Sequence, residues 1–344
     1  MSDTIGYAVI GLGVMGRTHV RAVHAARVAG LPCRLVAVCS PDARERAGLA
    51  GAGGNIGPTS HDEMMFDPSQ VRGVAEPEMI ARDGAVHAVS ICTPTDTHAE
   101  LAGIMLRAGK HVLIEKPVAI RSEDVRRLAR VAADSGRVCM PAMCMRFWPG
   151  WDWLKARVVD GSFGRVKSAV FTRVGSRPGW SPAFYADAAR CGGAIFDLHV
   201  HDADAVLWLF GRPREVVSVG SIDHITTQYR FAPSPGGPAI VSAEGGWYGA
   251  DGFPFRMRYT VEFERAVADW DLSRADPLLL VRDERATPVK LPTETAYERE
   301  VRAFIALLAG GGGQSPVTLQ DAIAVTELIE AERRSAQTGQ PVTL

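Results

Sequence analysis

The segment Gly11-Leu12-Gly13-Val14-Met15-Gly16 constrains the fold more than any other part of this chain. It follows the apolar run Tyr7-Ala8-Val9-Ile10 and precedes a stretch with helical periodicity. Glycines at this spacing allow a tight turn, a close approach of backbone to a pyrophosphate, and close packing of helix on strand. The helix N-terminus then offers unpaired N–H groups to phosphates. We therefore predict a dinucleotide at Gly11, Leu12, Gly13, Val14, Met15 and Gly16.

Short apolar runs alternate with helical stretches from Ile5 to about Met145. This alternation is typical of βαβ units with a parallel sheet. We predict a doubly wound Rossmann domain over residues 1–145. The stretch Gly48–Gly84 is less regular, with one short strand at Val71–Val74 and a loop at Gly51–Asn55. The other predicted strands are Leu35–Cys39, Val86–Cys92, His111–Ile114 and Arg137–Met140, and the clearest helices are Ala99–Ala108 and Ser122–Ser135.

The pattern changes after Trp148-Pro149-Gly150 to longer segments with a period of two. They are Val166–Val174, Glu215–Val219, Ile222–Phe231, Ala239–Trp247, Arg256–Phe263 and Val267–Leu272. Alternation of this kind favours a largely antiparallel sheet with one face on helices. We predict an α+β domain over residues 146–344 with a large, mostly antiparallel open sheet. Two helices, Ala296–Ala309 and Leu319–Gln337, follow the strands and are joined by the flexible Gly310–Gly313.

Composition and charge limit the classes of partner. The chain has 344 residues, which is more than one hydrophobic core usually organises. Its net charge of −1 gives no reason to expect nucleic acid or an anionic membrane as partner. The six cysteines form no CxxC pair, and no apolar run is long enough to cross a bilayer. Because the first strand begins at Ile5, no room remains for a signal peptide, and we expect a cytoplasmic protein.

A carboxylate and an imidazole stand four positions apart after Gly192-Gly193. On a helix, this spacing places Asp197 and His201 on one face and offers a base to whatever lies against it. His199, two positions from each, is turned away and is expected either to pack or to contact a site residue from behind. The His199-x-His201 spacing also suits a metal in a barrel hydrolase, but His224 is the only later histidine, so we predict no metal site. Asp204 is expected to stabilise its own helix.

Two further segments complete a family pattern. They are Ser90-Ile91-Cys92-Thr93-Pro94-Thr95-Asp96-Thr97-His98 and Gly109-Lys110-His111-Val112-Leu113-Ile114-Glu115-Lys116-Pro117. With the N-terminal glycines and the Asp197/His201 segment, the chain resembles the Gfo/Idh/MocA family of nicotinamide-dependent oxidoreductases. The resemblance implies that Thr93, Pro94 and His98 lie along the cofactor.

The same resemblance assigns roles near the reacting carbon. It implies that Glu115 and Lys116 belong to a Glu-Lys-Pro signature whose lysine reaches the nicotinamide and the substrate hydroxyl. It also implies that Asp197 is a substrate-binding acid and that His201 is the general base. Arg146 matches a basic position whose role varies, and we expect it to contact substrate. Trp180, an aromatic residue in a loop, is a further candidate for the substrate pocket.

The end of the second strand distinguishes NAD from NADP, because an acid there binds the ribose hydroxyls. Here the position is Ser40, followed by Pro41-Asp42-Ala43-Arg44. Ser40 and Arg44 suit a 2′-phosphate, whereas Asp42 suits the ribose hydroxyls. We expect NAD or NADP, with Ser40 and Arg44 favouring NADP.

We therefore predict hydride transfer between NAD(P) and a secondary hydroxyl or ketone of a sugar, an inositol or a related polyol. Lys116, Asp197 and His201 would carry the chemistry, which requires the lysine and the imidazole to meet at the nicotinamide. A glycosidase that acts by transient oxidation through a retained NAD, and a non-catalytic module that senses the dinucleotide, are the alternatives. An open sheet with one uncovered face also predicts a homodimer or homotetramer through the second domain.

Overall fold

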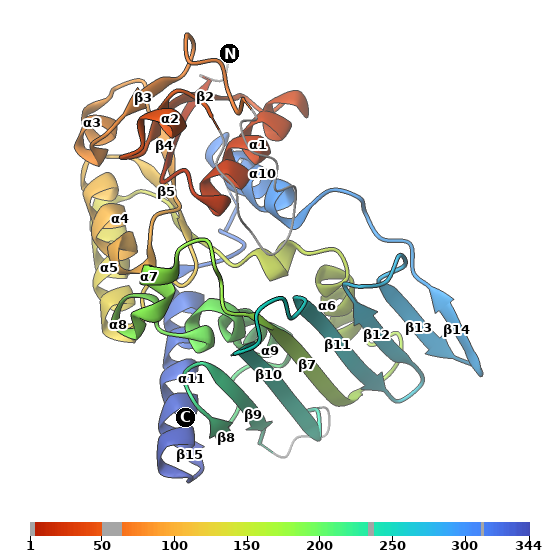
Figure 1. Ribbon diagram of the computed structural model, residues 1–344. Helices are drawn as coiled ribbons and strands as arrows, with labels where there is room; N and C mark the ends of the chain where they lie inside the picture. Colours follow the sequence, from red (N-terminus) through yellow and green to blue (C-terminus); the bar gives the residue numbers. More distant parts are fainter. Residues whose placement is uncertain (1–3, 50–63, 233–236, 311–312) are drawn as a thin grey trace. The chain divides into compact units, whose positions relative to one another are not determined.

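The computed structural model describes residues 4–49, 64–232, 237–310 and 313–344, and forms two compact units (Figure 1). The first unit comprises residues 1–144, 180–184 and 295–323, and the second comprises residues 145–179, 185–294 and 324–344. The domain boundary between residues 145 and 146 stays a prediction. The loop Gly51–Asn55 and the central residues of the Gly310–Gly313 connection lie outside the described residues.

The first unit is built on a six-stranded parallel sheet with the order β3-β2-β1-β4-β5-β6. The order reverses between β1 and β4, which is the point where ligands bind in doubly wound folds. This sheet confirms the predicted Rossmann fold. Its strands are β1 (Ile5–Ile10), β2 (Cys33–Cys39), β3 (Arg72–Val74), β4 (Ala88–Ile91), β5 (His111–Glu115) and β6 (Cys139–Ala142).

Helices cover both faces of this sheet, because the chain winds away from β1 in two directions. Helix α1 (Val14–Val28) packs against α10 (Ala296–Leu308), and α4 (His98–Arg107) packs against α5 (Ser122–Ser135) (Figure 1). The ring of Tyr7 meets the edge of Phe304 at 6.2 Å, which fixes α10 beside β1. Two short helices, α2 (Ala43–Arg46) and α3 (Pro77–Arg82), follow β2 and β3.

The second unit is built on a nine-stranded sheet with the order β14-β13-β12-β11-β7-β10-β9-β8-β15. Only β7 and β10 pair in parallel, so the prediction of a mostly antiparallel sheet is confirmed. The strands are β7 (Val166–Ser176), β8 (Glu215–Gly220), β9 (His224–Arg230), β10 (Ile240–Tyr248), β11 (Arg256–Phe263), β12 (Val267–Asp271), β13 (Leu278–Arg282), β14 (Arg285–Pro288) and β15 (Val342–Thr343).

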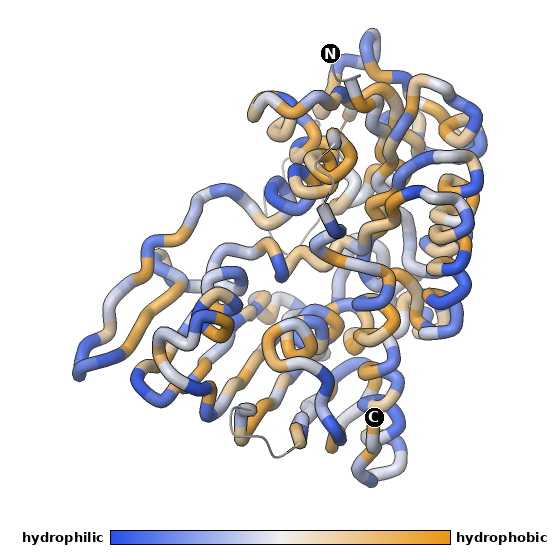
Figure 2. The backbone as a smooth tube through the Cα atoms, turned by 180° about the vertical axis from the view of Figure 1, so that it is seen from behind, coloured by the Kyte–Doolittle hydropathy of each residue, from blue (hydrophilic) through white to orange (hydrophobic). Residues whose placement is uncertain are grey.

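One face of the second sheet is buried and the other is exposed. Along β11, for example, Met257, Tyr259 and Val261 are buried while Arg258 and Thr260 between them are exposed. Figure 2 shows hydrophobic and hydrophilic residues alternating along the extended parts of the chain. Helix α9 (Val200–Phe210) and a π-helix (Ile195–His199) pack on β7 and β10. The remaining helices are α6 (Trp151–Asp160), α7 (Pro182–Ala186), α8 (Ala188–Cys191) and α11 (Leu319–Thr338).

None of the helices in the described part of the chain is both long enough and apolar enough to span a membrane.

Candidate active site

The glycine turn, Gly11 to Gly16, has the geometry that a dinucleotide requires. Gly11 has a φ of +85°, and a Cβ there would lie 2.7 Å from the carbonyl oxygen of Cys92. A Cβ on Gly16 would lie only 1.8 Å from the carbonyl oxygen of Gly11, whereas a Cβ on Gly13 would meet nothing within 4 Å. The first and third glycines therefore serve close packing, and the second leaves open space at the N-terminus of α1. These residues fit a bound dinucleotide.

Lys116 follows β5 and is joined to Pro117 by a cis peptide bond. Its backbone is held by a chain of hydrogen bonds between buried side chains. The Glu115 carboxylate accepts the Lys116 backbone N–H at 3.1 Å and lies 3.0 Å from Nε2 of His19. His19 in turn contacts the Ser90 hydroxyl at 2.8 Å through Nδ1. Burial raises the pKa of Glu115, but His19 and neighbouring positive charges lower it further, so the net shift is downward. Glu115 therefore holds the backbone of Lys116 in place.

His98 connects two of the predicted cofactor segments. Its Nδ1 lies 2.8 Å from the carbonyl oxygen of Pro117, and its Nε2 lies 2.8 Å from that of Thr93. The ring is buried, and burial lowers the pKa of His98 although both carbonyls oppose that shift. The turn at Thr93-Pro94 and the turn at Lys116-Pro117 are thus brought together at the carboxyl edge of the first sheet.

Ser40 directly follows β2 and is buried, and its hydroxyl already makes a hydrogen bond. Its Oγ donates to the Glu45 carboxylate at 2.5 Å. The Asp42 carboxylate, which was expected to suit the ribose hydroxyls, accepts the backbone N–H of Arg44 at 2.7 Å and so caps α2. Glu45 was not among the predicted site residues, because the sequence analysis looked for the acid at the strand end, and Glu45 lies five positions beyond Ser40.

In the second unit, Asp197 and His201 do not lie on one regular α-helix as predicted. Residues Ile195–His199 form a π-helix, and α9 begins only at Val200. A π-helical turn closes its hydrogen bonds over five residues instead of four, so the four-residue spacing is not that of one α-helical face. Asp197 is half-buried, and His201 is 9% exposed. Such π-helical turns occur frequently at functional sites.

The π-helix is anchored through His199. Its Nε2 lies 2.8 Å from the Glu332 carboxylate of α11 and 3.3 Å from the Tyr229 hydroxyl, and His199 and Glu332 are fully buried. Burial alone would lower the pKa of His199, but the facing Glu332 charge and hydrogen bond raise it further, so the net shift is upward. A Cβ on Gly245 would lie 2.6 Å from the Cβ of His199, so only glycine lets β10 pass this close.

Arg146 binds a carboxylate of its own unit. Its Nε and Nη2 donate to Asp204 at 3.0 and 2.6 Å, in a bidentate pair that is almost fully buried. Asp204, expected to stabilise its own helix, instead serves as the partner of this guanidinium. A parallel pair joins Arg173 of β7 to Asp202 at 2.9 and 3.1 Å. Trp180, the remaining predicted substrate contact, is 39% exposed.

Comparison with known proteins identifies the chain. Residues 5–143 match the oxidoreductase family with an NAD-binding Rossmann fold, and residues 151–266 match the GFO/IDH/MocA C-terminal domain. Inositol 2-dehydrogenase 1 of Saccharopolyspora erythraea is 30% identical over 352 residues, which cover 98% of this chain and 96% of that protein. The chain belongs to the GFO/IDH/MocA family of oxidoreductases. The resemblance drawn from its four sequence segments is therefore confirmed.

Two other proteins match nearly the whole chain. Inositol 2-dehydrogenase of Rhizobium meliloti (strain 1021) is 27% identical over 361 residues, which cover 99% of both chains. Levoglucosan dehydrogenase, solved in complex with NADH and levoglucosan, superimposes with a TM-score of 0.81 at 21% identity, over 98% of this chain and 99% of that one. At this identity, the structural match shows that the fold is shared.

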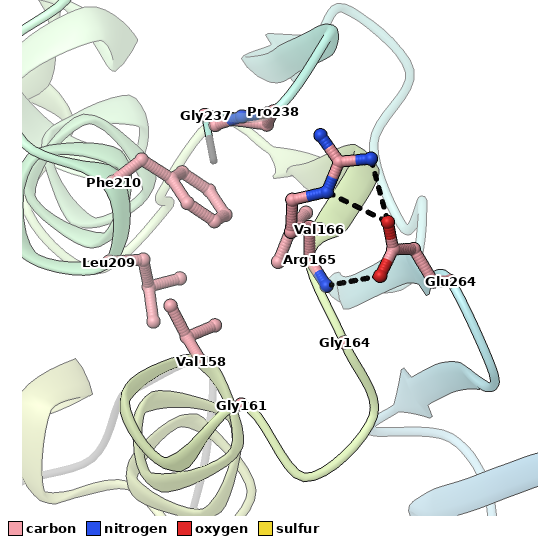
Figure 3. Close-up of a pocket in the computed structure, with 10 residues that line it drawn as sticks. All are labelled: Val158, Gly161, Gly164, Arg165, Val166, Leu209, Phe210, Gly237, Pro238 and Glu264. Atoms are coloured by element: carbon pink, nitrogen blue, oxygen red, sulfur yellow. Dashed lines mark hydrogen bonds and ion pairs between the residues drawn. The ribbon is translucent and has the colours of Figure 1, made fainter. Parts of the chain in front are cut away.

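One pocket of this family member contains none of the predicted site residues. It has a volume of about 510 Å³ and lies in the second unit (Figure 3). Leu209, Phe210 and Val158 point into it, and Arg165 is paired with Glu264 at its rim (Figure 3). Within residues 4–49, 64–232, 237–310 and 313–344, no group of three or more histidine, cysteine, aspartate or glutamate side chains could hold a metal ion.

Proposed function

We propose that this protein is an NAD(P)-dependent dehydrogenase or reductase that acts on a secondary hydroxyl or ketone of a sugar, an inositol or a related polyol. The observation that carries the proposal is the pairing of an open glycine turn with Lys116 at the same edge of the first sheet. The names of the full-length relatives, inositol 2-dehydrogenases, support a polyol substrate.

The cofactor would be held by the glycine turn and by Thr93, Pro94, His98 and Glu115. When bound, the nicotinamide supplies the acceptor or donor of a hydride. Lys116 would polarise the substrate oxygen and stabilise developing negative charge on it. The hydrogen bonds of Glu115 fix the backbone of this lysine, which supports its proposed role at the reacting carbon.

In this proposal, a ring nitrogen of His201 takes the proton of the substrate hydroxyl, because imidazole titrates near neutral pH. Asp197 would bind a neighbouring hydroxyl or orient the base. Arg146 and Trp180 would complete the substrate contacts. Because Asp204 fixes the orientation of the Arg146 guanidinium, we expect that group to contact a sugar hydroxyl without rearrangement.

We also propose that the protein works in the cytoplasm as a homodimer or homotetramer joined through the exposed face of the second sheet. Val170, Val219 and Ile240 on strands of that sheet are 44%, 66% and 60% exposed, and would supply apolar contacts to a second copy. Sedimentation that shows a stable monomer at micromolar concentration would refute the oligomer.

The activity test measures cofactor reduction with a panel of sugars and inositols, for the wild type and for His201→Ala. We expect turnover with at least one polyol and a loss of about 10²- to 10⁴-fold in the variant, with cofactor affinity unchanged. His111→Ala, at the amino end of β5, is the matched control and should retain turnover.

The alternatives give different results in the same assay. A sensing module would bind the cofactor but reduce none of it with any member of the panel. A glycosidase that uses transient oxidation would release hydrolysed sugar without a net change in cofactor absorbance. Either result would refute the proposed dehydrogenase.

A further inference from the structure

The carboxyl end of β2 lacks the acidic residue that usually binds the hydroxyls of the adenosine ribose. In the doubly wound fold, an aspartate or glutamate at this place binds the ribose hydroxyls of NAD, and its absence usually admits the 2′-phosphate of NADP. Here the strand ends at Cys39 and the next residue is Ser40, which is neutral. On residue type alone, the position therefore favours NADP.

The structure supplies a carboxylate at this place from another element. Glu45, on α2, accepts a hydrogen bond of 2.5 Å from the hydroxyl of Ser40. The Ser40 hydroxyl also accepts the backbone N–H of Asp42 at 3.1 Å, which fixes its direction of donation. The Glu45 carboxylate is therefore held at the end of β2 by the hydrogen bond from Ser40, whose hydroxyl is oriented by the backbone N–H of Asp42.

Glu45 is also close to the start of the phosphate-binding helix. Burial lowers the pKa of Arg17 in the first turns of α1, and the negative charge of Glu45 opposes that shift. Arg17 is itself directed at the glycine turn, since its Nη1 donates to the carbonyl oxygen of Leu12 at 3.4 Å. The carboxylate thus acts on both elements that flank the adenosine side of a bound dinucleotide, β2 and α1.

The neighbouring charged groups do not replace Glu45 in this role. The Asp42 carboxylate caps α2 through the backbone N–H of Arg44. Arg46 donates from Nη1 to the carbonyl oxygens of Ser40 and Pro41, both at 2.8 Å, and so braces the turn. Arg44 itself is exposed on α2. Of these side chains, only Glu45 places its charge on the hydroxyl of Ser40.

We propose that Glu45 is the specificity-determining residue of the cofactor site and makes this protein select NAD over NADP. This inference rests on the proposed function. Ribose hydroxyls can donate hydrogen bonds to a carboxylate, whereas the 2′-phosphate brings a further negative charge against it. Like charges brought together in a binding site lower the affinity strongly. The proposal reverses the preference for NADP that Ser40 and Arg44 suggest in the sequence.

The test is direct titration calorimetry of the full chain with NAD and with NADP. We expect the wild type to bind NAD at least about tenfold more tightly. Glu45→Gln keeps the size of the side chain and an acceptor for Ser40 but removes the charge, and should reduce this ratio by about tenfold or more. Glu123→Gln, an exposed acid on α5, is the matched control and should leave the ratio unchanged.

Two further variants keep the test decisive. Glu45→Asp retains the charge on a shorter side chain, so it should weaken NAD binding while NADP remains disfavoured. Arg44→Gln should weaken NADP binding only if that arginine reads the 2′-phosphate. A wild type that prefers NADP, or a ratio that Glu45→Gln leaves unchanged, would overturn the inference while the proposed function stands. Failure to bind either dinucleotide would overturn both together.

Discussion

Alanine at Gly16 should destabilise the fold, whereas alanine at Gly13 should leave the fold intact and weaken cofactor binding. At Gly16, the added Cβ would lie 1.8 Å from the carbonyl oxygen of Gly11, whereas Cβ atoms essentially never come closer than 3.0 Å, so α1 must move from β1 by about 1.2 Å. Overpacking of this kind costs about 1–3 kcal/mol. In a domain of this size, each kcal/mol lowers the melting temperature by about 2–4 °C. The melting temperature of the cofactor-free protein should therefore fall by about 2–12 °C.

Gly13→Ala should leave the fold intact and impair the cofactor. Gly13 has a φ of −61°, which alanine adopts, and its Cβ would meet nothing within 4 Å. We expect the free energy of unfolding to change by no more than about 0.5 kcal/mol. If the open space admits the pyrophosphate, the methyl group displaces it from the N–H groups of α1. Losing one charge-assisted hydrogen bond costs about 1.5–3 kcal/mol, or about tenfold to a hundredfold in affinity.

The assay compares melting temperatures without cofactor and NADH affinity by fluorescence titration. Gly84→Ala is the matched control, because its Cβ would also meet nothing within 4 Å but lies at the amino end of β4, opposite the cofactor edge. It should change neither quantity. Gly13→Ala protein that binds NADH as tightly as the wild type would refute the assignment of the open space. An unaltered melting temperature for Gly16→Ala would refute the packing argument.

Two other predictions concern buried histidine–carboxylate pairs. Glu332→Gln neutralises the partner of His199 and should cost about 3 kcal/mol, measured as thermal unfolding from pH 5.5 to pH 8.5. Because the pKa of folded His199 is raised, the deficit should be full below the unfolded value of about 6.5 and shrink as the pH rises through the folded value. Glu115→Gln should cost about 1.5–3 kcal/mol at pH 7 through its bond to His19, measured by urea unfolding. Since the pKa of folded Glu115 is lowered, this cost should disappear as the pH falls below about 4.3 through the folded value, and a constant deficit would contradict the assignment.

The first sheet could be predicted because its strands are buried on both faces and so form continuous apolar runs. All six residues of β1 are buried, and the glycine turn marks its end. The last strand was predicted at Arg137–Met140, whereas β6 spans Cys139–Ala142. That strand contains Pro141, which argues against a strand in sequence but is tolerated here because β6 lies at the edge of the sheet.

In the second unit, alternation predicted six strands, but three others were missed. Strands β13 and β14 form a hairpin whose turn residues, Asp283 and Glu284, have φ values of +50° and +60°. Turns of this geometry usually contain glycine or asparagine, so the pair Asp-Glu hides the hairpin from sequence analysis. Strand β15 has only two residues and depends on pairing with β8, more than a hundred residues earlier. Its existence is a tertiary effect.

The candidate site likewise has a part that could be predicted from the sequence and a part that could not. Lys116 and the glycine turn were accessible from sequence because their geometry is set by adjacent residues, as in the bond from the Lys116 backbone to Glu115. The relative orientation of Asp197 and His201 could not be predicted from the sequence, because the π-helix between them depends on distant groups. The π-helix requires a residue without a side chain at Gly245 on β10. It also requires the Glu332 carboxylate on α11, which binds His199. A four-residue spacing in sequence thus defines which groups are near one another, whereas the direction of His201, the proposed base, depends on how the sheet and the last helix pack against this segment.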